Sequence, residues 1–139
     1  MQREIVRDNM TAEVVSISPD ASLPEAHQVM KSNGIRRLPV VEDGRLLGII
    51  SLGDVLHAEP SDASTLSIWE VNALLAQLRV GELMSKSPVT VRDDANIAEA
   101  ATLMLEKKIA GLPVLDADGK LSGIITESDI FRLVVRNWQ

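Results

Sequence analysis

The chain has 139 residues and no cysteine, and 45% of its residues are hydrophobic while only 2% are aromatic. That length fits one compact domain or two small ones, and the composition requires an aliphatic core without disulfides or thiolate metal sites. The formal net charge of −6 argues against a nucleic-acid binder, which usually carries a basic face. The first nine residues lack the apolar stretch of a signal peptide, and no apolar run is long enough to span a bilayer. We therefore expect a soluble, cytoplasmic protein that does not insert into membranes.

The same pattern occurs twice along the chain, with one inserted residue in the turn at 116–118 of the second copy. The aligned pairs are Met10 and Met84, Asp20 and Asp94, Met30 and Met104, the Leu-Pro-Val runs at 38–40 and 112–114, Gly48 and Gly123, and Asp54 and Asp129. So many matches with a single gap indicate an internal repeat.

In the first copy, an apolar stretch at 14–17 predicts a strand. Ser22, with Glu25 three residues on, predicts the start of a helix. Two apolar runs at 38–41 and 46–50 flank Asp43-Gly44, which is a hairpin signal. A last helix is expected after Ser51.

The second copy has an apolar stretch at 89–91, an N-cap signal at Asn96, apolar runs at 112–115 and 121–125, and a last helix after Thr126. The repeats, at 1–57 and 80–139, therefore share the order β-α-β-β-α and predict the α/β (α+β) class. Because one such unit buries too little surface to be comfortable alone, we expect the two to pack as a pseudo-two-fold pair with a cleft between them.

The linker at 58–79 divides into an expected loop at 59–64 and a helix that begins after Ser67. One stripe of that helix is apolar, through Ile68, Val71, Leu75 and Leu78. The helix either lies on the pair as a connection or forms an oligomer contact anchored by Trp69.

Each last helix is preceded by a hydroxyl residue and carries an aspartate three positions later, as Ser51 with Asp54 and Thr126 with Asp129. These tetrapeptides are ordinary capping boxes. They could also hold a nucleotide, because free N–H groups at a helix start favour an anion and a carboxylate can accept from two ribose hydroxyls. Ser128 adds a further hydroxyl in the second copy. From the tetrapeptides alone the cap is the favoured role, because such boxes are common, and the two roles are compatible with each other.

Arg36 and Arg37 break the symmetry of the repeats, since their counterparts are Ala110 and Gly111. A guanidinium offers a planar fork of donors that suits phosphate. Strand alternation sends the two side chains to opposite faces, so one is expected to be a plain surface residue and Arg37 is the preferred phosphate ligand.

Taken together, the duplicated motifs resemble the CBS domain, the family named after cystathionine β-synthase, over residues 6–135. The motifs that carry the resemblance are Met10-Thr11 and Met84-Ser85, the two Leu-Pro-Val runs, and the segments at 48–54 and 123–129. The resemblance implies a disc-like pair of repeats, called a Bateman module. It also implies binding of AMP, ADP, ATP or S-adenosylmethionine in the inter-repeat cleft, and regulation of an attached or partner protein.

The resemblance assigns phosphate and ribose contacts to the Ser/Thr and Asp positions, and an apolar slot for the base to Val15, Ile35, Val89 and Ile109. The site with Ser51 and Asp54 is then expected to be the better anion site. The site with Thr126 and Asp129 has no arginine beside it in the sequence repeat, so we expect it to prefer a less charged ligand.

Nothing in the sequence resembles a catalytic constellation, so we expect no enzyme. His27 and His57 are far apart and lack metal-ligand spacing, and no cofactor is expected to be obligatory. The function we expect is a regulatory module for an unidentified protein. The alternative is a ligand-free structural or dimerisation module. A homodimer is expected through the helices near Leu83 and Leu133, with Phe131 and Trp138, unless those residues cover the pair's own core.

Overall fold

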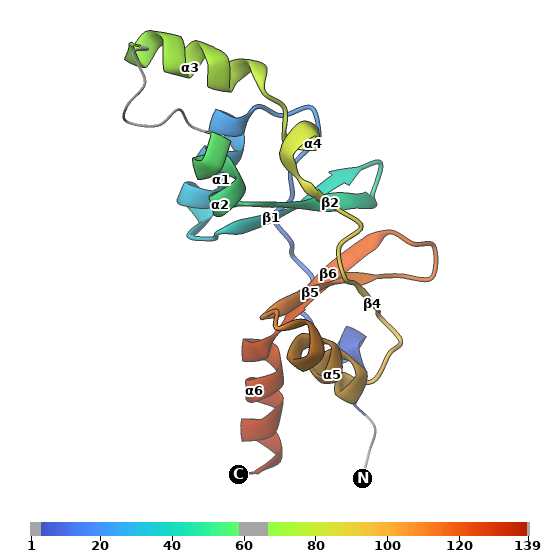
Figure 1. The fold of residues 1–139 in the computed structure, drawn as a ribbon. Helices are drawn as coiled ribbons and strands as arrows, with labels where there is room; N and C mark the ends of the chain where they lie inside the picture. Colours follow the sequence, from blue (N-terminus) through green and yellow to red (C-terminus); the bar gives the residue numbers. More distant parts are fainter. Residues whose placement is uncertain (1–3, 59–66, 139) are drawn as a thin grey trace. The chain divides into compact units, whose positions relative to one another are not determined.

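The computed structural model describes residues 4–58 and 67–138 (Figure 1). The elements are η1 (Val6–Asp8), α1 (Leu23–Asn33), β1 (Arg37–Glu42), β2 (Arg45–Ser51), α2 (Leu52–Ala58), α3 (Ile68–Gln77), α4 (Val80–Leu83), β3 (Ser85–Lys86), β4 (Val91–Arg92), α5 (Ile97–Lys107), β5 (Gly111–Leu115), β6 (Leu121–Thr126) and α6 (Glu127–Asn137). The loop expected at 59–64 lies outside the described residues. None of the described helices has the length and apolar character that a membrane span requires.

Two compact units make up the fold, and they do not coincide with the sequence repeats. The first-repeat unit consists of residues 15–88. The second-repeat unit combines residues 89–139 with residues 1–14 from the other end of the chain. Each unit therefore takes its opening segment from the part of the chain that precedes the other repeat.

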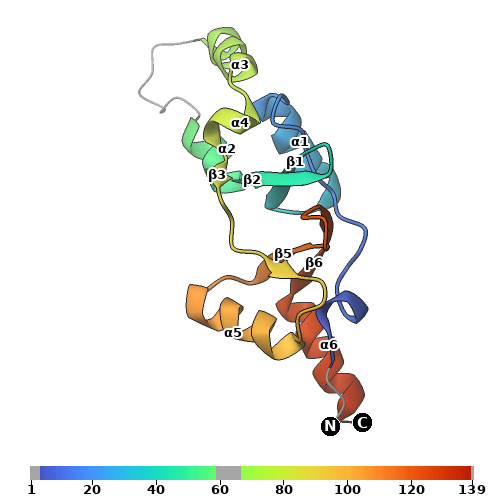
Figure 2. The same cartoon turned by 90° about the vertical axis from the view of Figure 1, so that its right-hand side faces the viewer.

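The first-repeat unit holds a three-stranded sheet in the order β1-β2-β3. β1 and β2 form the expected antiparallel hairpin, with Arg37 opposite Ser51, and β3 pairs antiparallel with β2. Helices α1 and α2 lie on one side of this sheet in both views (Figures 1 and 2). The prediction of a strand at 14–17 was wrong. Within this stretch only Ile17 pairs, in a single parallel bridge with Val40. The chain crosses from one unit to the other at 14–15, so this stretch cannot pair along its length.

The second-repeat unit holds the order β4-β5-β6, with β4 parallel to β5 and β6 antiparallel to β5. Helices α5 and α6 lie together on one side of this sheet (Figure 2). Thr11 bridges Ile124 of β6 in antiparallel fashion, as Ser85 pairs with Ile49 of β2 in the other unit.

A glycine stands wherever an opening segment crosses a sheet. A Cβ on Gly123 would lie 2.7 Å from the Thr11 carbonyl oxygen, and one on Gly48 would lie 2.5 Å from that of Ser85. The duplicated glycines therefore permit the backbone of the opening segment to approach the sheet.

The helix starts follow the capping signals of the sequence. The side chains of Ser22, Ser67 and Asn96 accept from the backbone N–H three residues on, at the starts of α1, α3 and α5. At its other end α1 stops at Gly34, whose φ of 64° is left-handed.

Each unit has its own aliphatic core. The buried cluster of the first-repeat unit is Leu23, Ala26, Met30, Leu38, Val40, Ile50, Val55 and Val80. That of the second-repeat unit is Val6, Val91, Ala95, Ala100, Met104, Leu112, Val114 and Ile125. Leu83 packs against the first cluster and therefore covers the core of its own unit, and Leu133 is buried, at 7% exposed.

The linker helix α3 has no buried residue. Leu75 and Leu78 pack against the core of the first-repeat unit, whereas Ile68 is 72% exposed and the neighbouring Trp69 is 81% exposed. One end of the expected apolar stripe thus covers this unit and the other end is open to solvent.

Candidate functional site

The start of α6 is a complete capping box. The Thr126 hydroxyl accepts from the Asp129 backbone N–H at 3.3 Å. In return, the Asp129 carboxylate accepts from the Thr126 N–H at 2.9 Å and from its hydroxyl at 3.1 Å. The Asp129 side chain is only 4% exposed. The capping role expected from the tetrapeptide is therefore confirmed, and it uses one carboxylate oxygen, Oδ2.

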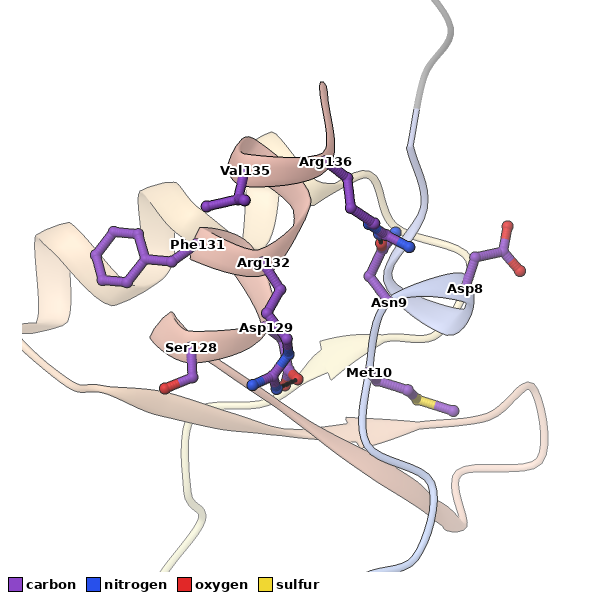
Figure 3. Close-up of a pocket in the computed structure, with 9 residues that line it drawn as sticks. All are labelled: Asp8, Asn9, Met10, Ser128, Asp129, Phe131, Arg132, Val135 and Arg136. Atoms are coloured by element: carbon purple, nitrogen blue, oxygen red, sulfur yellow. Dashed lines mark hydrogen bonds and ion pairs between the residues drawn. The ribbon is translucent and has the colours of Figure 1, made fainter. Parts of the chain in front are cut away.

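The other oxygen of Asp129, Oδ1, faces groups from elsewhere. It accepts from the Thr11 hydroxyl at 3.3 Å. It also accepts from Nη2 of Arg132 at 2.5 Å, a contact that Figure 3 shows. Thr11 comes from the opening segment that residues 1–14 contribute to this unit. Three hydroxyl or carboxylate groups and a guanidinium thus meet at one point.

Arg132 corrects one expectation from the sequence, namely that the site with Thr126 and Asp129 has no arginine beside it. The alignment of the two repeats pointed to an arginine at position 37 and gave no reason to expect one on α6. The signal that could have found Arg132 was local, since residues three apart on a helix are neighbours. No local signal points to Thr11, which is 118 positions from Asp129.

A pocket of about 520 Å³ opens beside these groups. Its wall, drawn in Figure 3, comes from the end of η1 and from one face of α6. The lining residues are Asp8, Asn9, Met10, Ser128, Asp129, Phe131, Arg132, Val135 and Arg136. Arg136 donates to the Asn9 side-chain oxygen at 2.7 Å. The pocket combines apolar walls with two guanidinium groups, a combination that suits an anion with an apolar part.

The equivalent place in the first-repeat unit is built differently. The Asp54 carboxylate accepts from the Ser51 N–H at 2.8 Å, and the Ser51 hydroxyl accepts from the Asp54 N–H at 3.1 Å. Arg37 stands directly across the hairpin from Ser51, and the Arg36 carbonyl accepts from the N–H of Leu52. Both arginine side chains are exposed. Arg36, Arg37, Ser51 and Asp54 therefore gather at one end of the hairpin.

The four apolar residues expected to line a slot for the base are distributed over the two units. Ile35 packs on the core of the first-repeat unit, and Val89 and Ile109 pack on that of the second. Val15, at 38% exposed, is the most open of the four. Each unit thus holds two of these residues with its own capping box.

Metal binding has no support in the described residues, which hold no group of three or more His, Asp or Glu side chains that could share an ion. His27 lies on α1 and His57 on α2. The Nδ1 atom of His57 is 2.7 Å from the Gly53 carbonyl oxygen.

Solved structures with this fold include that of CBSX2 from Arabidopsis thaliana in complex with AMP. It is 33% identical to this chain, covers 98% of it and 99% of its own length, and has a TM-score of 0.80. The CBS domain pair of protein MJ0100 in complex with 5′-methylthioadenosine and S-adenosyl-L-methionine is 25% identical. It covers 98% of this chain and 99% of its own, with a TM-score of 0.74.

Among curated relatives, a CBS domain-containing protein of Dictyostelium discoideum is 35% identical, over 95% of this chain and 92% of its own length. Protein MJ1225 of Methanocaldococcus jannaschii is 31% identical over 94% of this chain. The chain spans 47% of that relative and 22% of the inosine-5′-monophosphate dehydrogenase of Korarchaeum cryptofilum, to which it is 34% identical. The sequence pattern of the CBS domain matches residues 3–61 and 80–136. With a duplicated match over most of its length, the chain belongs to the CBS-domain family.

Proposed function

We propose that this chain is a regulatory module that senses an adenosine-type ligand, such as AMP, ADP, ATP or S-adenosylmethionine. The observation that carries the proposal is the meeting of Thr11, Thr126, Asp129 and Arg132 beside a pocket of about 520 Å³. Two relatives with the same fold support it, since one was solved with AMP and the other with 5′-methylthioadenosine and S-adenosyl-L-methionine.

The chemistry of the site fits the parts of a nucleotide. A buried carboxylate accepts from ribose hydroxyls, and guanidinium groups donate to phosphate oxygens. In the first-repeat unit, Asp54 and Ser51 with Arg37 offer the same kinds of group. We assign ribose contacts to Asp54 and Asp129, and phosphate contacts to Arg37, Ser51, Thr126 and Ser128. Arg36 is the weaker candidate of the arginine pair. The base would lie against Val15 and Ile35, or Val89 and Ile109.

No catalytic step or obligatory cofactor belongs to this proposal. A module of this kind acts by binding its ligand more tightly in one of two arrangements, which changes its affinity for a second protein.

Calorimetric titration with AMP, ADP, ATP and S-adenosylmethionine tests the proposal. Asp54→Asn and Asp129→Asn each keep the shape of the side chain and remove its charge, so we expect each to weaken binding at one site by tenfold or more. Asp20→Asn, at an exposed turn position, is the matched control and should bind as the unmodified chain does.

Circular dichroism of each variant separates lost binding from lost folding. Saturable binding that one aspartate variant abolishes, in a folded protein, supports the sensor. A folded chain that binds none of the four compounds would contradict it and leave both aspartates as helix caps.

We also propose that the chain forms a homodimer through an exposed apolar stripe on α6. Phe131, Val134, Val135 and Trp138 are 64%, 48%, 55% and 85% exposed, at the i, i+3, i+4, i+7 spacing of one helix face. A large uncovered apolar stripe is unusual on a soluble monomer, and two copies of it can cover each other around a two-fold axis.

Sedimentation velocity tests the dimer. Val134→Asp should convert it to monomer, because a charge in the middle of the covered stripe would be buried without a partner. Leu105→Asp places the same charge at an 80% exposed leucine of α5 and should leave the dimer intact. A monomeric unmodified chain would overturn the assembly and leave the ligand proposal standing.

A further inference from the structure

The Asp129 carboxylate has no accepting capacity left. Oδ2 accepts from the N–H and hydroxyl of Thr126, and Oδ1 accepts from Thr11 and Arg132. A carboxylate offers about four lone-pair positions, and four donors occupy them. A ribose can bind here only if one of the present donors leaves.

The two oxygens differ in how easily they can be released. The partners of Oδ2 form the capping box, and breaking them would undo the first turn of α6. The partners of Oδ1 are the long 3.3 Å bond from Thr11 and the guanidinium of Arg132, whose side chain is 66% exposed. An exposed side chain can swing away without disturbing the core, so Arg132 is the donor that a ligand displaces.

The first-repeat unit lacks this obstacle. The residue three positions after Asp54 is His57, whose Nδ1 faces the Gly53 carbonyl oxygen. Within the described ranges 4–58 and 67–138, no cation is ion-paired with Asp54, whose carboxylate accepts from the Ser51 N–H. The two sites therefore differ in whether the ribose-reading carboxylate is already occupied.

We propose that Arg132 is a specificity-determining residue that closes the Asp129 site to neutral adenosine compounds and opens it to phosphorylated ones. The inference rests on the proposed function and deepens it. A neutral nucleoside would put a ribose hydroxyl in place of the guanidinium on Oδ1 and leave Arg132 in solvent, so the ion pair of Arg132 is lost with no new anionic partner. A phosphate on the same ligand takes over the released guanidinium, whose planar fork suits its oxygens. Arg132 lines the pocket, and its guanidinium lies against the Asp129 carboxylate (Figure 3).

The test compares AMP with adenosine by calorimetry, in chains that carry Asp54→Asn so that the first-repeat site is silenced. Arg132→Gln should tighten adenosine binding about tenfold and weaken AMP binding by a similar factor, which is the size expected for one charge-assisted hydrogen bond gained or lost. The preference for AMP over adenosine should therefore fall by about a hundredfold. Arg92→Gln removes another arginine of the same unit, ion-paired with Asp94 outside the pocket, and should leave the preference unchanged.

A purely structural role of Arg132 would change both affinities together, because the two ligands share base and ribose, and it would not move their ratio. An unchanged ratio in folded Arg132→Gln overturns the inference and leaves the sensor function intact. Adenosine binding that appears only after the substitution supports the inference. Absence of binding of either ligand to every folded variant overturns this inference, and absence of AMP binding to the folded chain with Asp54 intact overturns the sensor function as well. Should Arg132→Gln not fold, Arg132→Lys keeps the charge without the fork and should lower the preference for AMP by a smaller factor.

Discussion

Asp54 and Asp129 cap their helices with the same bonds and differ in their surroundings. The Asp129 side chain is 4% exposed and accepts from four donors. Asp54 is half-buried, and its hydrogen bonds are the two capping bonds with Ser51. Removing a partner that leaves buried donors unpaired is more damaging than removing an exposed cap.

We therefore expect Asp129→Ala to lower the free energy of unfolding by about 2–3 kcal/mol, against about 1 kcal/mol for Asp54→Ala. Urea unfolding measures both values, and Asp20→Ala serves as the exposed reference. Equal losses from the two caps would show that the bonds of Asp129 to Thr11 and Arg132 add nothing to stability.

A second prediction concerns Gly123. Its added Cβ would meet backbone at 2.7 Å, and backbone cannot yield as a flexible side chain can. We expect Gly123→Ala to destabilise the chain by about 1–3 kcal/mol. Gly53→Ala is the matched control, because its Cβ would meet only the Ser51 hydroxyl, at 3.5 Å, and alanine favours the helix. A neutral Gly123→Ala in urea unfolding would mean that the opening segment is free to move off β6.

Local chemistry made Thr126 and Asp129 visible in the sequence, because a hydroxyl and a carboxylate three apart form a recognisable cap. The gathering of Arg36 and Arg37 beside Ser51 also follows from hairpin register. The contact of Thr11 with Asp129 could not be predicted from the sequence, because helical periodicity and capping motifs relate only residues a few positions apart. Arg132 could have been predicted from helix spacing, because residues three apart on a helix are neighbours, but the alignment of the two repeats does not reveal it.

At the scale of elements, the capped helices and the tight hairpins could be predicted, since each depends on residues within a few positions of one another. The opening segments could not. The apolar stretch at 14–17 has the composition of a strand and pairs only at Ile17. The strand with which this stretch pairs depends on which unit the chain enters, and that depends on contacts between residues far apart in the sequence.

The short η1 helix shows how an opening segment is held. The N–H of Val6 donates to the Ala95 carbonyl at 2.8 Å, and the Val6 side chain is fully buried in the core of the second-repeat unit. Val6→Ala should lower the free energy of unfolding by about 2 kcal/mol, from lost burial and the cavity left behind. Leu105→Ala removes more atoms at an 80% exposed position of α5 outside that core and should change it by less than about 0.5 kcal/mol. Similar losses from both substitutions in thermal or urea unfolding would contradict the anchoring role of η1.

For the molecule as a whole, the exchange of opening segments means that each sequence repeat lends part of itself to the other unit. Val6 stands before the first repeat's own helices and belongs to the core of the second-repeat unit. Val80 follows the linker and belongs to the core of the first-repeat unit. A substitution at Val6 or Val80 is therefore expected to destabilise the unit built mainly from the other sequence repeat.

Native-state hydrogen exchange can detect this crossing, because separate compact units open with their own free energies. Val6→Ala should weaken the protection of amides in β5 and β6 more than in β1 and β2, and Val80→Ala should do the reverse. Both residues are fully buried, so the two substitutions are matched in chemistry and in burial. If protection fell instead within the repeat that contains the substituted residue, residues 1–57 and 80–139 would be the real units of folding. Equal loss over the whole chain would mean that the two units unfold as one.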